Sequence, residues 1–170
     1  LVTEGYMDVV ALAQLGFANA VATLGTACTP DHIHKLFRFT DAVVFSFDGD
    51  GAGIRAANRA ADLALPFIKP ERTVRFALLP DGKDPDDLVR HEGRAPFDAV
   101  MAGARPLAEM IWNREVQGAN FETPESRAAL EARLRQVTGV IADEDVRRHY
   151  QQNMRERLNT FFRPAQRQGG

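Results

Sequence analysis

The sequence predicts an α/β fold, with a mostly parallel four-stranded sheet and flanking helices followed by an all-helical region. Short β-rich runs alternate with helical patterns over residues 1–95, and no strand pattern follows them. The run Ala42–Phe47 is almost continuously apolar, as expected of a central parallel strand that is buried on both faces. We therefore expect an α/β domain at residues 1–95, a helical subdomain at 96–162 and a disordered tail at 163–170.

Local signals place the individual elements. The predicted strands are Leu1–Thr3, Ala20–Thr23, Ala42–Phe47 and Val74–Leu79. Thr29-Pro30 and Thr123-Pro124 each predict a helix start, because a hydroxyl caps the first turn and the proline that follows needs no N–H there. Beyond residue 95, apolar residues recur at helical spacing in three segments, which predicts three packed helices.

Composition and charge exclude several classes of protein. Of 170 residues, 45% are hydrophobic and 26% charged, which is typical of a folded globular protein and not of a disordered one. No apolar run reaches the ~18 residues of a membrane span. A single cysteine, Cys28, forms no internal disulfide and favours a reducing, intracellular compartment. The net charge of −2 differs from that of proteins that coat nucleic acid. Because the chain starts in the middle of a strand pattern at Leu1, we expect it to be part of a longer protein, with the first strand truncated.

Acidic residues follow three of the four predicted strands. Glu4 follows the first strand, Asp48 and Asp50 the third, and Asp84 and Asp86 the fourth. Since parallel strands present their carboxyl ends at one edge of a sheet, these side chains are expected to converge. Two carboxylates ~4 Å apart repel by roughly 4 kcal/mol at an effective dielectric of ~20, so the cluster requires a cation. Oxygen ligands without His or Cys select Mg²⁺ or Mn²⁺, and five acids suffice for two metal ions.

The Asp-Gly-Asp-Gly segment has simpler interpretations. Such a segment alone is more often an ordinary turn than a metal site. An EF-hand is excluded, because counting from Asp48 places Ala52 and Arg59 where calcium ligands are required. A dinucleotide-binding loop is excluded as well, since its glycine spacing differs and its flanks are not acidic. The three acidic groups on three strand ends are what favour a metal centre.

The motifs together resemble a known family. They are Glu4–Val10, Leu24–Thr26, Phe47–Gly53 and Leu79–Asp86. In order and spacing they are similar to the Toprim domain of the bacterial replicative primases of the DnaG type. The resemblance covers residues 1–95, and the helices that follow are similar to the helical subdomain of that family's polymerase core.

The resemblance implies a DNA-dependent RNA polymerase that makes short RNA primers on single-stranded DNA. It implies ribonucleoside triphosphates as substrates, two-metal nucleotidyl transfer with Mg²⁺ (Mn²⁺ substituting), and a cytoplasmic protein of the replication machinery. A zinc-binding domain, the basic half of the polymerase core and a C-terminal domain that binds the replicative helicase would lie outside this chain. The chain alone is therefore expected to be inactive.

The resemblance also implies roles for individual acids. It assigns catalysis and metal binding to Glu4, Asp48 and Asp50, and further metal ligands to Asp84 and Asp86. Asp8 matches another acid of the family motif, and its place on a helix suits support of the ligands behind them. Nucleic-acid-binding residues stay unassigned. The candidates, which surface solvation explains equally well, are Arg55, Arg59, Arg90 and Arg94.

Two alternatives stay open. Another Toprim enzyme, a nuclease or a topoisomerase, would use the same acids for strand cleavage. A topoisomerase also needs a nucleophilic tyrosine, and neither Tyr6 nor Tyr150 is suitably placed, while Leu79–Asp86 favours a primase over a nuclease. The second alternative is a non-catalytic scaffold whose loops are held by metal.

Overall fold

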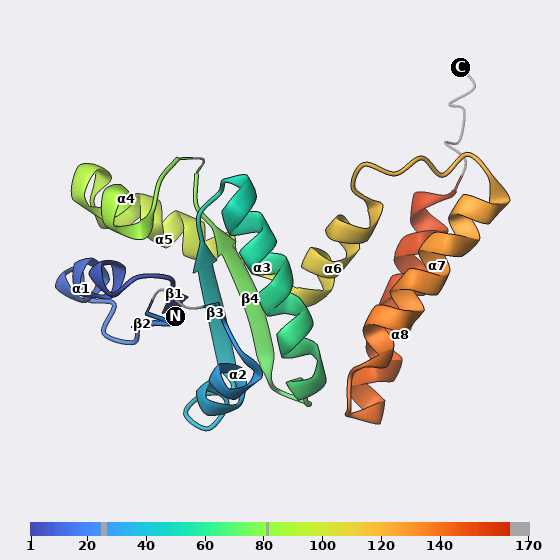
Figure 1. The fold of residues 1–170 in the computed structure, drawn as a ribbon, viewed down its shortest axis with the longest axis horizontal. Coiled ribbons are helices and arrows are strands. Elements are labelled where there is room, and N and C mark those ends of the chain that lie inside the picture. The colour runs from blue at the N-terminus through green and yellow to red at the C-terminus, as the bar shows by residue number, and fades with distance from the viewer. Residues whose placement is uncertain (25–26, 81, 164–170) are drawn as a thin grey trace, which may run out of the picture.

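The computed structural model describes residues 1–24, 27–80 and 82–163. It contains a sheet in the order β2-β1-β3-β4-β5 (Figure 1). Its strands are β1 (Val2–Thr3), β2 (Val21–Ala22), β3 (Ala42–Phe47), β4 (Thr73–Leu78) and β5 (Arg105–Pro106). The first four strands are mutually parallel, and β5 is antiparallel to β4. The predicted mostly parallel α/β sheet is confirmed.

The fifth strand corrects one expectation. We predicted four strands and none beyond residue 95, yet Arg105 pairs with Phe76 and Pro106 with Arg75. This edge strand has two residues and contains proline, which lacks a ladder N–H, so no β-rich run marks it in the sequence. Its pairing depends on the tertiary position of β4.

Helices connect the strands and extend beyond the sheet. They are α1 (Tyr6–Gln14), α2 (Pro30–Leu36), α3 (Gly51–Ala64), the 3₁₀-helix η1 (Leu65–Phe67), α4 (Pro85–Glu92), α5 (Arg94–Ala102), α6 (Leu107–Val116), α7 (Pro124–Gly139) and α8 (Glu144–Phe161). Both predicted caps form: the Thr29 hydroxyl accepts from the His32 N–H, and the Thr123 hydroxyl from the Ser126 N–H. None of the helices in the described residues has the length and apolar character of a membrane span.

Two apolar clusters bury the sheet between layers of helices. One cluster joins α1, α4 and α5 through Leu12, Leu88 and Phe97. The other lies on the face covered by α2, α3 and α6, and includes Phe45 on β3. The Phe45 ring stacks on the rings of Phe47 and Phe76, with centroid distances of 5.9 and 5.6 Å. The strand β3 is thus buried as its apolar run predicted.

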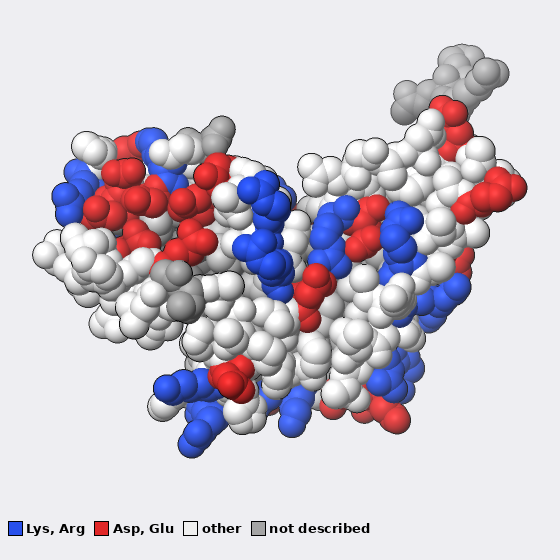
Figure 2. Space-filling model, in the orientation of Figure 1, with Lys and Arg blue, Asp and Glu red and all other residues white. Residues whose placement is uncertain are grey.

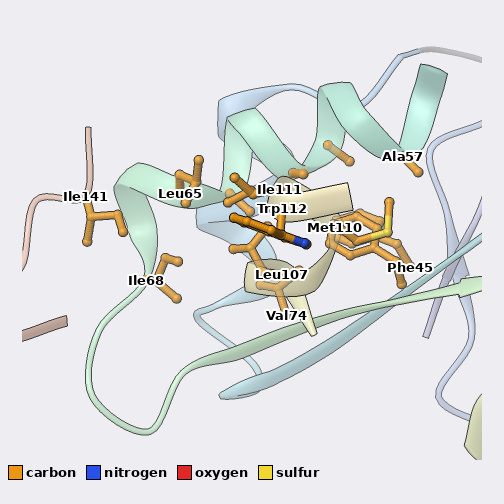
Figure 3. Close-up of a cluster of buried hydrophobic side chains, with 14 of the residues drawn as sticks. Phe45, Ala57, Leu65, Ile68, Val74, Leu107, Met110, Ile111, Trp112 and Ile141 are labelled. Carbon is orange, nitrogen blue, oxygen red and sulfur yellow. The ribbon is translucent and has the colours of Figure 1, made fainter. Parts of the chain in front are cut away.

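The helical region is continuous with the second cluster. Leu107, Met110 and Ile111 of α6 pack against the sheet and α3, and Ile141 lies beyond Leu65 and η1 (Figure 3). α7 and α8 stand as a pair beside α6 (Figure 1). A boundary at residue 95 stays a prediction, and so does a disordered tail, since residues 164–170 lie outside the described residues.

An ion-pair network reinforces this contact at the surface. The Arg114 guanidinium on α6 donates to Asp62 on α3 at 2.7 Å and to Glu115 at 3.0 Å. Glu115 in turn pairs with Arg133 on α7 at 3.2 Å. The Glu115 side chain, which is 12% exposed, therefore links the α/β layer to the α7–α8 pair.

Ser46 on β3 is expected to tolerate loss of its hydroxyl. It is 2% exposed, and its Oγ has no hydrogen-bond partner within the described residues. Ser46→Ala removes an unsatisfied polar atom, so we expect the free energy of unfolding to stay level or rise by about 1 kcal/mol in urea titrations. The control is Thr138→Val, which removes a buried hydroxyl that donates to the Leu134 carbonyl, and which should lower it by about 1 kcal/mol. A larger loss in Ser46→Ala than in Thr138→Val would contradict this account.

Candidate metal centre at the carboxyl edge of the sheet

Three strands end at the same edge of the sheet, and acidic residues follow each of them. Strand register pairs Val2 with Phe45 and Phe47 with Leu78, so β1, β3 and β4 reach this edge together. In Figure 1 the carboxyl ends of β3 and β4 lie at the top, next to the loops that lead into α3 and α4. Figure 2 shows a gathering of acidic side chains over this part of the surface, with basic side chains beside it over α3. The α/β topology therefore brings together acids that are distant in sequence.

Glycines allow the two acidic loops to lie against each other. A Cβ at Gly49 would be 1.9 Å from the Leu79 carbonyl oxygen, so only glycine fits between Asp48 and Asp50 at this approach. The Leu79 N–H donates to the Phe47 carbonyl at 3.0 Å and continues the β3–β4 ladder past the end of β4. The loop after β3 is thereby fixed against the segment that leads to Asp84.

Asp48 is the electrostatic centre of the group. The pKa of Asp48 is raised to about 6, by burial first and then by the charges of Glu4, Asp84, Asp50 and Asp8, in that order of effect. Glu4, Asp50 and Asp84 come from the ends of three different strands, and the charge of each acts on Asp48. Ionising Asp48 in such surroundings is costly unless a cation is present.

Glu4 lies at the exposed side of the same group. Its pKa is raised by burial first and then by Asp8 and Asp50, while Arg59 on α3 acts in the opposite direction. The Glu4 side chain makes no hydrogen bond or ion pair within the described residues, and its residue is exposed. It is therefore an available oxygen donor at the rim of the acid group.

Asp50 and Asp84 are fixed by helix capping. The Asp50 Oδ1 accepts from the Gly53 N–H at 2.7 Å at the start of α3, and the Asp84 Oδ1 accepts from the Asp87 N–H at 2.7 Å at the start of α4. Backbone N–H groups and the helix dipole stabilise a carboxylate at such a position. The caps thus hold two acids at the sheet edge.

Asp8 accepts hydrogen bonds from two of the acidic segments. It is 8% exposed and accepts hydrogen bonds from the Gly5 N–H at 3.2 Å and the Asp86 N–H at 3.4 Å. Burial is the first cause of its raised pKa, and these two hydrogen bonds oppose it. Asp8 therefore ties the turn after β1 to the first turn of α4, 78 residues further along the chain.

Asp86 is less closely engaged with the acid group. Its Oδ1 accepts from the Arg90 Nε at 2.7 Å, and it is not among the groups that raise the pKa of Asp48. The structure brings Asp86 beside Asp8 through its backbone N–H, but pairs its carboxylate with a cation of its own helix.

The donor chemistry of this edge fits a hard divalent cation. Every side chain of the group offers carboxylate oxygen, the ligand type of Mg²⁺ and Mn²⁺. In the parts of the chain that the structure describes, no three His, Cys, Asp or Glu side chains already form a set that could hold one metal ion. Repulsion between ionised carboxylates opposes such a set without a cation. The charges of neighbouring acids raise the pKa of Glu4 and that of Asp48. Their assignment as metal ligands stays a prediction.

The four arginine candidates separate into two pairs. Arg90 is held by Asp86, and Arg94 pairs with Asp98, donates to the Leu15 carbonyl at 2.8 Å and lies over the Phe17 ring. Both therefore have structural partners. Two arginines on α3, Arg55 and Arg59, are exposed and form no ion pair within the described residues. Parts of two motifs, Gly25, Thr26 and Asp81, lie outside the described residues.

Comparison with known proteins identifies the family to which the chain belongs. A family model described as Toprim-like matches residues 1–89, and the chain belongs to that family. Among curated proteins, it is 46% identical to a DNA primase of Escherichia coli K12 and 42% identical to a DNA primase of Rickettsia felis, each over 93% of this chain. The chain spans 27% of the length of these relatives.

Solved structures give the same class. The E. coli primase catalytic core matches with a TM-score of 0.86 and 45% identity over 93% of this chain and 51% of that chain. A DNA primase domain from Pseudomonas aeruginosa matches with a TM-score of 0.83 and 42% identity over 94% and 49% of the two chains. The resemblance to bacterial DNA primases inferred from the motifs is therefore confirmed, as is the fold.

The helical region has a match of its own. A family model described as the DnaB-helicase binding domain of primase covers residues 108–161, which include most of α6 and all of α7 and α8 up to Phe161. We predicted helicase contact in a further C-terminal domain, whereas this family model matches a segment within the chain. Periodicity alone indicated only packed helices there.

Proposed function

We propose that this chain is the Toprim and helical part of a primase catalytic core, which synthesises short RNA primers on single-stranded DNA from ribonucleoside triphosphates. The observation that carries the proposal is that Glu4, Asp50 and Asp84, which follow three different strands, all raise the pKa of Asp48 through their charges. Relatives named DNA primase, at 42% and 46% identity, support the same reaction.

In this proposal Glu4, Asp48 and Asp50 bind Mg²⁺, and Asp84 and Asp86 complete the ligand set. When bound, the divalent cations would favour deprotonation of a primer hydroxyl and neutralise charge on the incoming triphosphate. Mn²⁺ would serve as a substitute, since it shares the preference for carboxylate oxygen.

The chain's own residues position these groups. Asp50 and Asp84 are held as helix caps, and Asp8 fixes the turn that carries Glu4 relative to α4. Glu4 is exposed and has a raised pKa, so it is placed either to bind a cation or to accept a proton from an attacking hydroxyl. Preorganised carboxylates of this kind reduce the rearrangement that reaction requires.

The similar proteins also indicate the partners of this chain. A solved relative at 44% identity is described as a DnaG primase catalytic domain bound to single-stranded DNA, and we propose a single-stranded DNA template for this chain. We further propose that residues 108–161 contribute to contact with the replicative helicase, as the matching family model suggests. The proposal includes a cytoplasmic location, and places a zinc-binding domain outside residues 1–170.

A direct comparison of activities tests the proposal. A full-length primase that contains this chain is incubated with single-stranded DNA, ribonucleoside triphosphates and Mg²⁺, and the products are resolved by length. We expect short RNA that depends on template and metal, and none from the 170-residue chain alone. Cleavage of DNA without RNA synthesis would favour a nuclease. Stabilisation by metal without either reaction would favour a scaffold.

A further inference from the structure

A hollow of about 390 Å³ opens beside the acid group, on the sheet face that carries α2 and α3. It lies over β1 and β3, and residues of α3 line it together with Thr23, Ala27 and Cys28. Its apolar lining consists of Val2, Phe45, Phe47, Ala56, Ala60 and Leu63. The volume falls in the range of pockets that bind small molecules, roughly 300–1,000 Å³.

The polar residues of this hollow carry opposite charges. Glu4 belongs both to the hollow and to the acid group, so the two sites are continuous. Arg59 projects from α3 into the same lining and lies close enough to Glu4 to lower its pKa. The hollow therefore combines an apolar floor with one cation, next to carboxylates that require metal.

The arginines near the hollow differ in their partners. Arg114 is held by Asp62 and Glu115. Arg55, one turn before Arg59 on α3, folds back along its own helix, since a Cβ at Gly51 would be 3.3 Å from the Arg55 Nη1. The Arg59 guanidinium forms no hydrogen bond or ion pair with the residues that the structure describes. An arginine in this state is a ready donor for a phosphate.

A nucleotide satisfies all of these features together. A base and sugar suit an apolar floor that includes the edge of an aromatic stack, and phosphates suit a guanidinium beside metal-binding carboxylates. A free phosphate would leave the apolar floor unfilled, and an apolar ligand would leave Arg59 without a partner.

We propose that this hollow receives the nucleoside part of a ribonucleotide whose phosphates lie at the acid group, and that Arg59 binds the phosphate next to the sugar. This inference rests on the proposed function, because it assigns the acid group to a nucleotide reaction. It adds a subsite and a binding residue that neither the strand-end motifs nor the helix caps indicate.

Cys28 provides a direct probe of occupancy. It is the only cysteine of the chain, is half-buried and lines the hollow. Burial raises the pKa of its thiol, so maleimide labelling of the 170-residue chain is measured at mildly alkaline pH. We expect ATP with Mg²⁺ to slow labelling at least about fivefold, and Mg²⁺ with inorganic tripolyphosphate to leave the rate unchanged. Equal slowing by tripolyphosphate would overturn the nucleoside assignment.

Two arginine variants on α3 distinguish binding of the phosphate by Arg59 from a general effect of positive charge. Arg59→Gln should raise the ATP concentration needed for protection roughly tenfold, the usual effect of losing one charge-assisted hydrogen bond. Arg55→Gln removes the same charge one turn away and should leave protection as in the wild type. Ordinary KM values reach ~1 mM. If ATP at about ten times that concentration does not slow the labelling of Cys28, the subsite is refuted. Unchanged protection in Arg59→Gln would refute the role of Arg59.

Kinetics distinguish this inference from the proposed function. In a full-length primase that contains this chain, Arg59→Gln should raise the KM for ribonucleotides roughly tenfold and change kcat less than about threefold. If Mg²⁺-dependent primer synthesis is observed but ATP leaves Cys28 labelling unchanged, the subsite is wrong and the function stands. If ATP protects Cys28 but no RNA is made, the subsite stands and the function is wrong.

Discussion

Asp48→Asn is expected to abolish primer synthesis and, at the same time, to stabilise the metal-free chain at neutral pH. The activity of a full-length primase that contains this chain should fall by about 10²–10³-fold or more, because a central cation ligand at the reacting phosphate is lost. Asparagine keeps the size of the side chain but carries no charge, so the repulsion from Glu4, Asp84 and Asp50 disappears. A ligand whose loss improves folding is the sign of a functional site.

The pH dependence of stability gives the sign of this effect. The pKa of Asp48 is about 6 in the folded chain and 3.8 when unperturbed, so the folded state keeps its proton over that interval and the unfolded state does not. Stability from this group is therefore present at low pH and is lost as pH rises through about 6. In urea titrations with a metal chelator present, the free energy of unfolding of Asp48→Asn should exceed that of the wild type. The difference should grow as pH rises to about 6 and stay constant above it. A variant that is less stable than the wild type at neutral pH would disprove this interpretation.

Asp41 and added metal supply the controls for Asp48. Asp41 precedes β3 as Asp48 follows it, and its side chain is 74% exposed. Asp41→Asn should leave both primer synthesis and the pH profile of stability as in the wild type. Saturating Mg²⁺ should raise the midpoint of thermal unfolding of the wild type by about 5–10 °C, and should have little effect on Asp48→Asn.

Gly49→Ala is expected to damage both stability and activity. The Cβ of an alanine at this position would lie 1.9 Å from the Leu79 carbonyl oxygen. This oxygen is a backbone atom, so it cannot move aside as the end of a flexible side chain can. The loop after β3 must then move away from β4, at a cost of about 1–3 kcal/mol or more in the free energy of unfolding. Displacing Asp48 and Asp50 from Asp84 by about 1 Å should lower activity about 10²-fold.

A second glycine tests whether the close approach is the cause. A Cβ at Gly139, the last residue of α7, meets nothing within 4 Å. Gly139→Ala should therefore leave activity unchanged and stabilise the chain slightly, because alanine favours helix. Urea titration and primer synthesis are measured on both variants. Equal effects of Gly49→Ala and Gly139→Ala would show that contact with Leu79 is unimportant.

The sequence predicted those features that local chemistry determines. The apolar run Ala42–Phe47 became β3 with the same bounds, and Thr29 and Thr123 cap the helices that they were expected to begin. The acids follow parallel strands that end at the same edge of the sheet. Glu4 and Asp48 could therefore be placed near each other from the order of strands alone.

Features that depend on tertiary contacts could not be predicted. The strand β5 exists through its pairing with β4, and its own residues carry no strand pattern. The hydrogen bond from the Asp86 N–H to Asp8 joins segments far apart in the sequence, with no periodic signal at either end. The hollow beside Arg59 arises where α3 and the chain near Cys28 leave space over the sheet, which no motif encodes.

Anomalous diffraction from crystals of the chain grown or soaked with Mn²⁺ would examine the metal centre most directly. We predict at least one strong manganese peak within bonding distance of Asp48 Oδ and of carboxylate oxygens of Glu4 or Asp50, with the peak absent in Asp48→Asn. Manganese bound elsewhere, or no peak while these carboxylates face apart, would contradict the central claim that acids from three strand ends together hold a divalent cation.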